Sequence, residues 1–474
     1  MKLPRITPYA YFLVAATSLL IPFPLAHARM VTQIVPTLKV TEEYKDNYFQ
    51  TETDTFEEWK TSYELGFSLG FLNQRSKIYL EYNPEYTDYK NLDDRDGLDH
   101  NFNLSGTWQA TKHTSAMIDM NYDGNDGNNT GESWKHSASA SVDSQLTKTI
   151  TTSIAYDYSN SYEQQVRTGD YKEHQTHSAN ASINKALGPR NSMGANFSYE
   201  TDAYQNSDAD EYESYEPSAF LTYWFTRRDG VETNLEYQEK KFDAPDGNDY
   251  ETIAGDIRYI RKFAKHLDGY AKYRHYISDR EDGDHVIYHP SVGVDWDITE
   301  DSGISLGIGI LFHDWDNNND DSTDPFLDLN VYKIFNFSPK GSLSITASSS
   351  YEESDEDAAS LGYNTSYQAG FSLNYKLARR LSSQLFGSYQ LQQFEDTIDR
   401  QDDTIEIGGG LTWNPLKWLQ ISANASHTNY KTDDSSRDNY KDNTISVFVR
   451  FAPERPIRPE KILSRKTLEA KLFD

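Results

Sequence analysis

The stretch GISLGIGILF, Gly303 to Phe312, alternates apolar residues with serine and glycine over most of its length. Ile304, Leu306 and Ile308 would share one face of an extended chain, with the small residues between them on the other face. A period of two is the pattern of a β-strand whose two sides meet different surroundings. The stretch therefore predicts a strand with one face suited to lipid and the other suited to water.

The same alternation recurs along the chain, for example in SKIYLEYNPEY (76–86) and NTISVFVRF (443–451). Between Val31 and Phe451 the pattern predicts about 22 strands of roughly 10 to 14 residues, with 18 to 24 strands compatible with it. An even number places both ends of a closed sheet on the same side.

The predicted connections also alternate in kind. Tight links such as NQRS (73–76) and FSPKG (337–341) take turns with longer acidic ones such as NLDDRDG (91–97) and DNNNDDSTD (316–324). Short turns on one side and longer loops on the other are typical of transmembrane β-barrels. An exported β-sandwich array or β-solenoid is the alternative, but a solenoid shows a fixed repeat of matching residues, which is not found. We therefore expect an all-β, transmembrane, antiparallel up-and-down barrel.

The first residues are typical of an export signal. Lys2 and Arg5 precede an apolar run that ends at Ala26-His27-Ala28, which predicts a Sec signal peptide cut after Ala28. No later apolar run reaches the length that a spanning helix needs. The expected organisation is a signal peptide at 1–28, a barrel at 29–452 and a periplasmic tail at 453–474, in the outer membrane of a Gram-negative bacterium.

Composition excludes several classes of function. A net charge of −29 makes nucleic acid an unsuitable partner, because phosphate contacts need clustered Lys and Arg. The absence of cysteine excludes disulfides, zinc thiolates and thiol nucleophiles. The 34 tyrosines argue against disorder and suit an aromatic girdle at the membrane surface. The tryptophans near predicted strand ends are Trp59, Trp108, Trp134, Trp315 and Trp413.

The early start of the first predicted strand bears on how the barrel is filled. It begins at Val31, which leaves no room for a plug domain between the signal and the barrel. A barrel of 22 strands would be on the order of 40 Å across, and outer loops of about 6 to 13 residues are too short to fill it. The lumen is then expected to be filled by its own side chains, to be flattened, or to be open to a large molecule. An open lumen of this width would need a gating or docking partner.

Alternation also predicts which side chains face the lumen. These candidates are Glu64, Tyr79, Glu81, Glu85, Asp119, Asp157, Trp224, Glu236, Arg258, Tyr270, Lys272, Arg274, Asp295, Asp297, Phe386, Glu406 and Arg450. The excess of carboxylates should disfavour small anions. Rings beside carboxylates suit sugars, whereas simple packing of rings within a crowded lumen is the alternative.

The sequence also contains patterns that resemble a calcium site or a hydrolase site. The stretches DWDNNNDD (314–321) and DGNDGNN (123–129) resemble calcium loops, but neither has the glycine and ligand spacing of an EF-hand. We expect solvated outer loops, bridged loosely to lipopolysaccharide by divalent ions. His285 and the pair His313-Asp314 show no spacing that supports a hydrolase. No enzyme activity, cofactor or metal centre is therefore expected.

The tail leaves two readings open. Residues 453–474 contain six basic and four acidic residues, with Pro456 and Pro459 ahead of a short helical pattern. The segment is either disordered or a periplasmic docking segment that binds an export partner or partly plugs the lumen.

One family resemblance rests on the first hairpins. The strand VPTLKVTEEY (35–44), followed by Asp46-Asn47 and an aromatic pair, and the Tyr-rich LEYNPEYTDY (80–89) resemble the putative β-barrel porin family. The likeness covers the chain from about Val31 to Phe451. It implies an outer-membrane component of exopolysaccharide export and carries over no catalytic residue, and the basic tail departs from the family pattern.

Three functions are compatible with these observations. The first is a barrel that supports export of a surface polysaccharide through pore shape and lumen polarity. The second is a general diffusion porin for small sugars or cations, and the third is a structural or adhesive barrel without transport. The expected partners of the protein are outer-membrane lipids, lipopolysaccharide and the exported polysaccharide. Asp46-Asn47, which first suggests a binding site, is expected to mark the exit of the first strand, with Tyr44 at the membrane interface.

Overall fold

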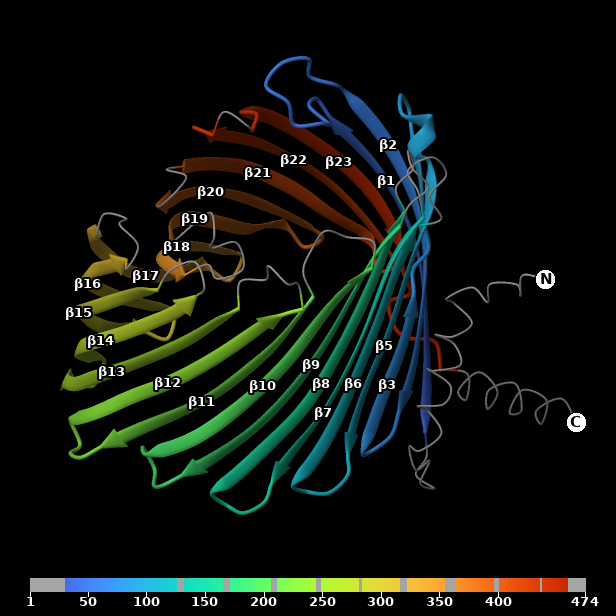
Figure 1. The fold of residues 1–474 in the computed structure, drawn as a ribbon. Helices are drawn as coiled ribbons and strands as arrows, with labels where there is room; N and C mark the ends of the chain where they lie inside the picture. The colour runs from blue at the N-terminus through green and yellow to red at the C-terminus, as the bar shows by residue number, and fades with distance from the viewer. Residues whose placement is uncertain are drawn as a thin grey trace, which may run out of the picture.

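The chain forms a closed antiparallel β-barrel (Figure 1). A computed structural model describes residues 30–125, 132–164, 171–205, 211–243, 249–280, 284–315, 322–353, 363–395, 400–434 and 437–458. The predicted signal peptide and residues 459–474 of the predicted tail lie outside this part of the chain.

Within the described residues, twenty-three strand segments make up the sheet. They are β1 (Val31–Lys45), β2 (Glu58–Leu72), β3 (Ser76–Tyr82), β4 (Glu85–Tyr89), β5 (Gly97–Gln109), β6 (Thr114–Asn125), β7 (Ser133–Gln145), β8 (Ile150–Gln164), β9 (Tyr171–Ala186), β10 (Ser192–Gln205), β11 (Tyr212–Trp224), β12 (Asp229–Phe242), β13 (Tyr250–Ala264), β14 (Leu267–Arg280), β15 (His285–Thr299), β16 (Ser302–Trp315), β17 (Ser322–Ser338), β18 (Gly341–Glu353), β19 (Tyr363–Ala378), β20 (Leu381–Glu395), β21 (Arg400–Leu416), β22 (Leu419–Thr432) and β23 (Tyr440–Phe451). A 3₁₀ helix, η1 (Asp93–Arg95), follows β4.

The barrel has 22 strand positions, because β3 and β4 are two parts of one strand. Both pair with β2 on one side and β5 on the other, and the register with β2 runs unbroken from Tyr82 to Glu85. The break falls at Asn83-Pro84, where proline cannot donate to the ladder. The predicted strand number is therefore confirmed.

The connections sort onto two ends of the barrel. Turns of two residues, such as 265–266 and 339–340, alternate with longer loops such as 46–57. The barrel begins at Val31 and closes after Phe451, both at the end that carries the short turns. The predicted alternation of tight and long connections is confirmed, and we name the two ends the short-turn end and the long-loop end.

The two faces of the sheet differ in chemistry. Cross-strand pairing places Leu38 opposite Leu65, and the same face carries Ile154, Leu235 and Ile308. These last four side chains are 60 to 64% exposed, the reverse of what a soluble domain does with large apolar residues. The opposite face turns into the barrel and carries most of the charged positions of the strands.

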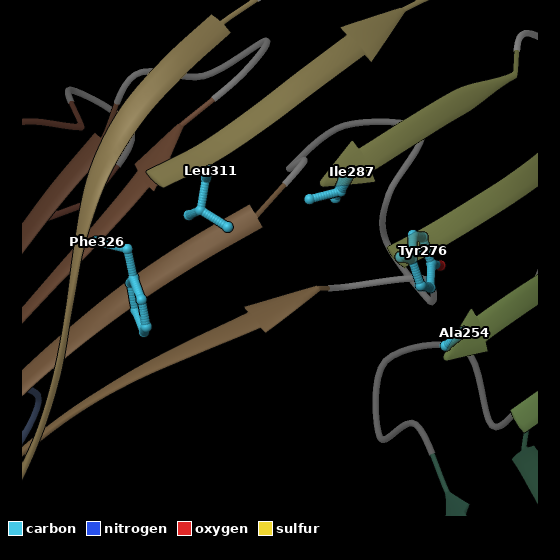
Figure 2. Packing of buried hydrophobic residues seen from close by; sticks show 5 residues of the cluster. All are labelled: Ala254, Tyr276, Ile287, Leu311 and Phe326. Atoms are coloured by element: carbon cyan, nitrogen blue, oxygen red, sulfur yellow. The ribbon is translucent and has the colours of Figure 1, made fainter. Parts of the chain in front are cut away.

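Part of the inner face is apolar and buried. Ala254, Tyr276, Ile287, Leu311 and Phe326 form a buried apolar cluster on the neighbouring strands β13 to β17 (Figure 2). Each of them lies near the long-loop end of its strand. The inner wall is therefore packed in this sector, although its overall character is polar.

Among the described residues, no helix is long and apolar enough to cross a bilayer.

The pair Asp46-Asn47 joins the first strand to the last one. The Asn47 side chain is 1% exposed, and its amide nitrogen donates to the carbonyl oxygens of Thr51 (2.7 Å) and Lys441 (3.0 Å). Asp46 Oδ1 accepts from the backbone N–H of Asn443 at 2.7 Å. The pair marks the exit of β1, as expected, and it also clamps the long-loop end of the barrel closure, which the sequence did not indicate.

Replacing Asn47 by alanine should lower the free energy of unfolding by about 1–3 kcal/mol, because the hydrogen bonds of this buried side chain to the carbonyl oxygens of Thr51 and Lys441 are lost. Urea unfolding of the folded barrel in detergent, followed by the loss of its heat-modifiable gel band, measures the change. The control is Asn414→Ala, which removes an exposed amide at the short-turn end and should leave unfolding unchanged. Equal effects of the two substitutions would contradict the clamp.

Candidate functional site

The cross-strand register places every predicted lumen position on the face opposite the apolar outer belt. For example, Glu64 pairs with Glu85, Arg258 with Lys272, and Lys272 in turn with Ser291. Nine of the candidates are acidic and four are basic. Their position is a feature of the structure, and their part in a transport path stays a prediction.

The inner wall is hollowed at the long-loop end, between β2 and β10. This cavity has a volume of about 960 Å³. Its lining includes the predicted residues Glu64 and Glu85, together with Asp99, Asp123 and Lys135. We name it the rim cavity, and carboxylate and amide side chains make up about half of its lining.

Amides on β5 and β6 hold the carboxylates of the rim cavity in place. Asn125 Nδ2 donates to Asp99 Oδ1 at 2.6 Å, and Asn101 Nδ2 donates to Asp123 Oδ1. Each pair spans two neighbouring strands at the same height. The carboxylate oxygens are therefore oriented before any ligand arrives, which lowers the entropy lost on binding.

A ring pair forms one side of the rim cavity. His174 on β9 and Tyr204 on β10 stack with ring centroids 4.3 Å apart and planes 3° apart. Asp202 holds both rings, since it lies 2.6 Å from His174 Nε2 and accepts from Tyr204 OH at 3.0 Å. Thr176 Oγ1 also donates to Asp202 at 2.6 Å. Stacked rings beside fixed carboxylates and amides are a surface that suits a sugar ring.

Sequence reasoning missed His174, Asp202 and Tyr204. Asp202 and Tyr204 are two residues apart, and so are His174 and Thr176, so the members of each pair share one face of their strand. This spacing does not show that β9 and β10 bring them into contact, because that depends on the register between the strands.

A second group of predicted residues forms a charged cluster on the inner face of β12 to β16. Arg258 donates to Asp295 at 2.5 Å and lies 3.4 Å from Glu232 Oε2, and its guanidinium carbon is 4.2 Å from the ring centre of Tyr270. Ser305 Oγ also donates to Asp295, at 2.7 Å. Arg258, Tyr270 and Asp295 are thus brought together, and their charges satisfy one another within the wall.

The inward rings lie flat against the barrel wall, each over a glycine of a neighbouring strand. A β-carbon at Gly408 would come within 2.6 Å of Phe386, one at Gly230 within 2.7 Å of Trp224, and one at Gly70 within 3.1 Å of Tyr79. Tyr270 covers Gly293 and Gly307 in the same way. This arrangement favours packing over a sugar track for these rings, because their positions are explained by the wall itself.

Several predicted lumen residues stand apart from both groups. Glu81 accepts from Ser68 at 3.3 Å, and Glu236 accepts from Asn234 at 2.5 Å. The register places the others around the inner face, and these are Asp119, Asp157, Lys272, Arg274, Asp297, Glu406 and Arg450.

The described residues contain no group of three or more His, Cys, Asp or Glu side chains arranged to hold a metal ion. The predicted calcium-like stretches lie mostly outside the described residues. The absence of a metal centre and of enzyme activity stays a prediction.

Gly293→Ala should destabilise the barrel by about 1–3 kcal/mol, the range for overpacking a close-packed site. The added β-carbon would overlap the Tyr270 ring and lie 2.5 Å from the carbonyl oxygen of Leu306. Unfolding in urea at equilibrium measures the loss. Gly188→Ala is the matched control, because a β-carbon at this turn residue meets nothing within 4 Å. A Gly293→Ala barrel as stable as the control would show that Tyr270 does not need this glycine.

Comparison with known proteins supports the predicted resemblance. Residues 335–452 match the family described as Putative beta-barrel porin 2. The match covers β18 to β23 entirely and ends where the barrel closes. No curated protein matches the sequence.

Solved structures share the barrel fold at low identity. The ferric enterobactin receptor PfeA of Pseudomonas aeruginosa is 9% identical, with a TM-score of 0.58 over 89% of this chain and 81% of that one. The siderophore receptor PirA of Acinetobacter baumannii is 9% identical, with a TM-score of 0.57 over 89% and 80%. BauA, the ferric preacinetobactin receptor of Acinetobacter baumannii, is 10% identical, with a TM-score of 0.55 over 88% and 80%. At this identity the likeness to these receptors shows the fold alone. The chain is a closed 22-strand barrel, and its residues 335–452 match the Putative beta-barrel porin 2 family.

Proposed function

We propose that this protein is an outer-membrane channel that supports the export of a surface polysaccharide. The observation that carries the proposal is the rim cavity on the inner wall of a 22-strand barrel, with stacked rings beside oriented carboxylates and amides. The exposed apolar side chains on the outer face of the strands form a belt that suits insertion in a bilayer. The predicted signal peptide supports delivery to the outer membrane of a Gram-negative bacterium.

The chemistry of the inner wall supports a polar polymer as the cargo. A sugar chain offers hydroxyl groups to carboxylates and amides and its apolar ring faces to aromatic side chains. The long-loop end would face outward and the short-turn end the periplasm, as in other barrels of this kind. The rim cavity would then be the last surface that the polymer meets before release.

The proposal assigns the barrel a binding and guiding part and no chemical step. No enzyme activity, cofactor or resident metal is proposed. Outer-membrane lipids and lipopolysaccharide are the proposed surroundings of the apolar belt. The predicted tail, residues 453–474, is proposed to contact a periplasmic export partner.

Deleting the gene in its own bacterium should stop release of one surface polysaccharide while the polymer continues to be made and stays with the cells. Polysaccharide in the medium and in the cell fraction, measured by sugar composition, gives the result. Complementation with the intact gene should restore release, and complementation with Asp202→Ala, which frees the ring pair, should restore it only in part. Unchanged release in the deletion strain would refute the proposal.

The channel should also favour cations over anions by roughly two-fold or more, because carboxylates dominate its inner face. Reversal potentials in planar bilayers under a salt gradient measure the ratio. Glu64→Gln combined with Glu85→Gln should lower it, whereas Asp88→Asn, which removes an exposed charge from the outer face of β4, should not. A barrel that conducts no ions would favour the structural alternative, and a freely open pore without effect on polysaccharide would favour a general porin.

A further inference from the structure

The closure between β1 and β23, which we name the seam, is shorter than the strands that form it. β1 pairs with β2 over its whole length, from Val31 to Lys45. It pairs with β23 only from Leu38 to Lys45, because β23 ends at Phe451. The part of β1 nearest the short-turn end therefore has no β23 residue beside it.

Pro36 lies on this part of β1, at a position where it matters to the seam. In an antiparallel ladder, the backbone groups of every second residue point to the same neighbour. Ile34 bonds toward the seam side, so Pro36 faces that side too, where it has no N–H to donate. Proline is favoured at strand edges for this reason, although this barrel also holds Pro217 and Pro290 within paired strands. Over its first residues β1 resembles an edge strand on the seam side, because no β23 residue lies beside it there and Pro36 has no donor for that side.

The last inward pair of the seam is also unfavourable. Lys39 lies directly opposite Arg450, and like charges directly opposite each other weaken a strand pair. The Lys39 ammonium instead bonds Glu64 of β2, with a nitrogen to oxygen distance of 3.1 Å. Lys39 also lies 5.8 Å from the ring centre of Phe448 on β23, so its ion pair is with β2 and its contact across the seam is with an aromatic ring.

A short segment after β23 bridges this weak part. Ile34 N donates to Ile457 O at 2.9 Å, and Ile457 N donates to Ile34 O at 2.8 Å. The same segment bonds the neighbouring turn, where Ala452 N donates to Trp418 O at 3.0 Å and Lys417 pairs with Glu454 at 2.5 Å. We name residues 452–458 the strap.

The two ends of the seam are held very differently. At the long-loop end, the buried Asn47 and the carboxylate of Asp46 bond the backbone of β23. At the short-turn end, the described residues provide one backbone bridge, between Ile34 and Ile457. The short-turn end of the seam is therefore held by fewer bonds than the long-loop end.

We propose that the barrel opens sideways at its seam from the short-turn end, and that the strap keeps this end shut. The opening would join the lumen to the membrane on that side. It rests on the fold alone and does not depend on what the barrel carries. Detachment of the strap breaks the two backbone hydrogen bonds between Ile34 and Ile457, and the like-charged pair Lys39–Arg450 is then the last inward pair at this end of the seam.

Distances between nitroxide spin labels across the seam test the proposal. The chain contains no natural cysteine, so Thr41→Cys with Phe448→Cys labels the two facing strands alone. The full-length protein in lipid vesicles should give one narrow distance distribution. With Ile457→Pro, which removes a bridge donor, the fraction of long distances should rise roughly five-fold, the change expected when about one hydrogen bond is lost. Deletion of residues 453–474 should do the same without introducing a proline.

The matched control is Ser68→Cys with Glu81→Cys, a facing inward pair between β2 and β3. Its distances should stay narrow in both strap variants. Arg450→Glu, which places opposite charges across the seam, should reduce the long distances in the Ile457→Pro protein. Seam distances that stay as narrow as the control in both variants would overturn the proposal, as would equal broadening of both label pairs.

Discussion

The structure depends on one constraint, which is that each strand must find a hydrogen-bonding neighbour on both sides. A strand edge in a bilayer leaves N–H and C=O groups without water, at a cost of several kcal/mol for each group. Closure of β1 on β23, from Leu38 to Lys45, covers more than half of both edges of the sheet at once. All other features of the barrel, including its polar inner face, its short turns and its apolar belt, are possible only after this closure.

The inner wall combines three solutions to the burial of side chains in a lumen. In one sector, apolar residues around Leu311 and Phe326 pack against one another. In another sector, the Asp295 carboxylate neutralises the charge of Arg258, and the Tyr270 ring covers the Arg258 guanidinium. Rings elsewhere lie on glycines of the next strand. Polar side chains remain exposed between these sectors, and the rim cavity between β2 and β10 is lined by such side chains.

The sequence predicted the strands well because their period is carried by each strand separately. Ile304, Leu306 and Ile308 define a lipid face without reference to any other segment, and so the strand number and the two kinds of connection could be predicted. The rim cavity was only half foreseen. Glu64 and Glu85 were expected on the inner face, whereas the contact of His174 with Asp202 and Tyr204 depends on the register between β9 and β10.

Alternation along the chain determined by itself which side of each strand meets lipid and which meets the lumen, since successive side chains point to opposite faces. It also determined that Asp46-Asn47 follows the first strand. Only the tertiary structure decided that this pair binds β23, which is the last strand in the sequence. It also decided that Ile457 pairs with Ile34. The physical reason is that backbone hydrogen bonds between strands carry no sequence signature: any residue but proline can make them, so the partners are chosen by closure of the whole sheet.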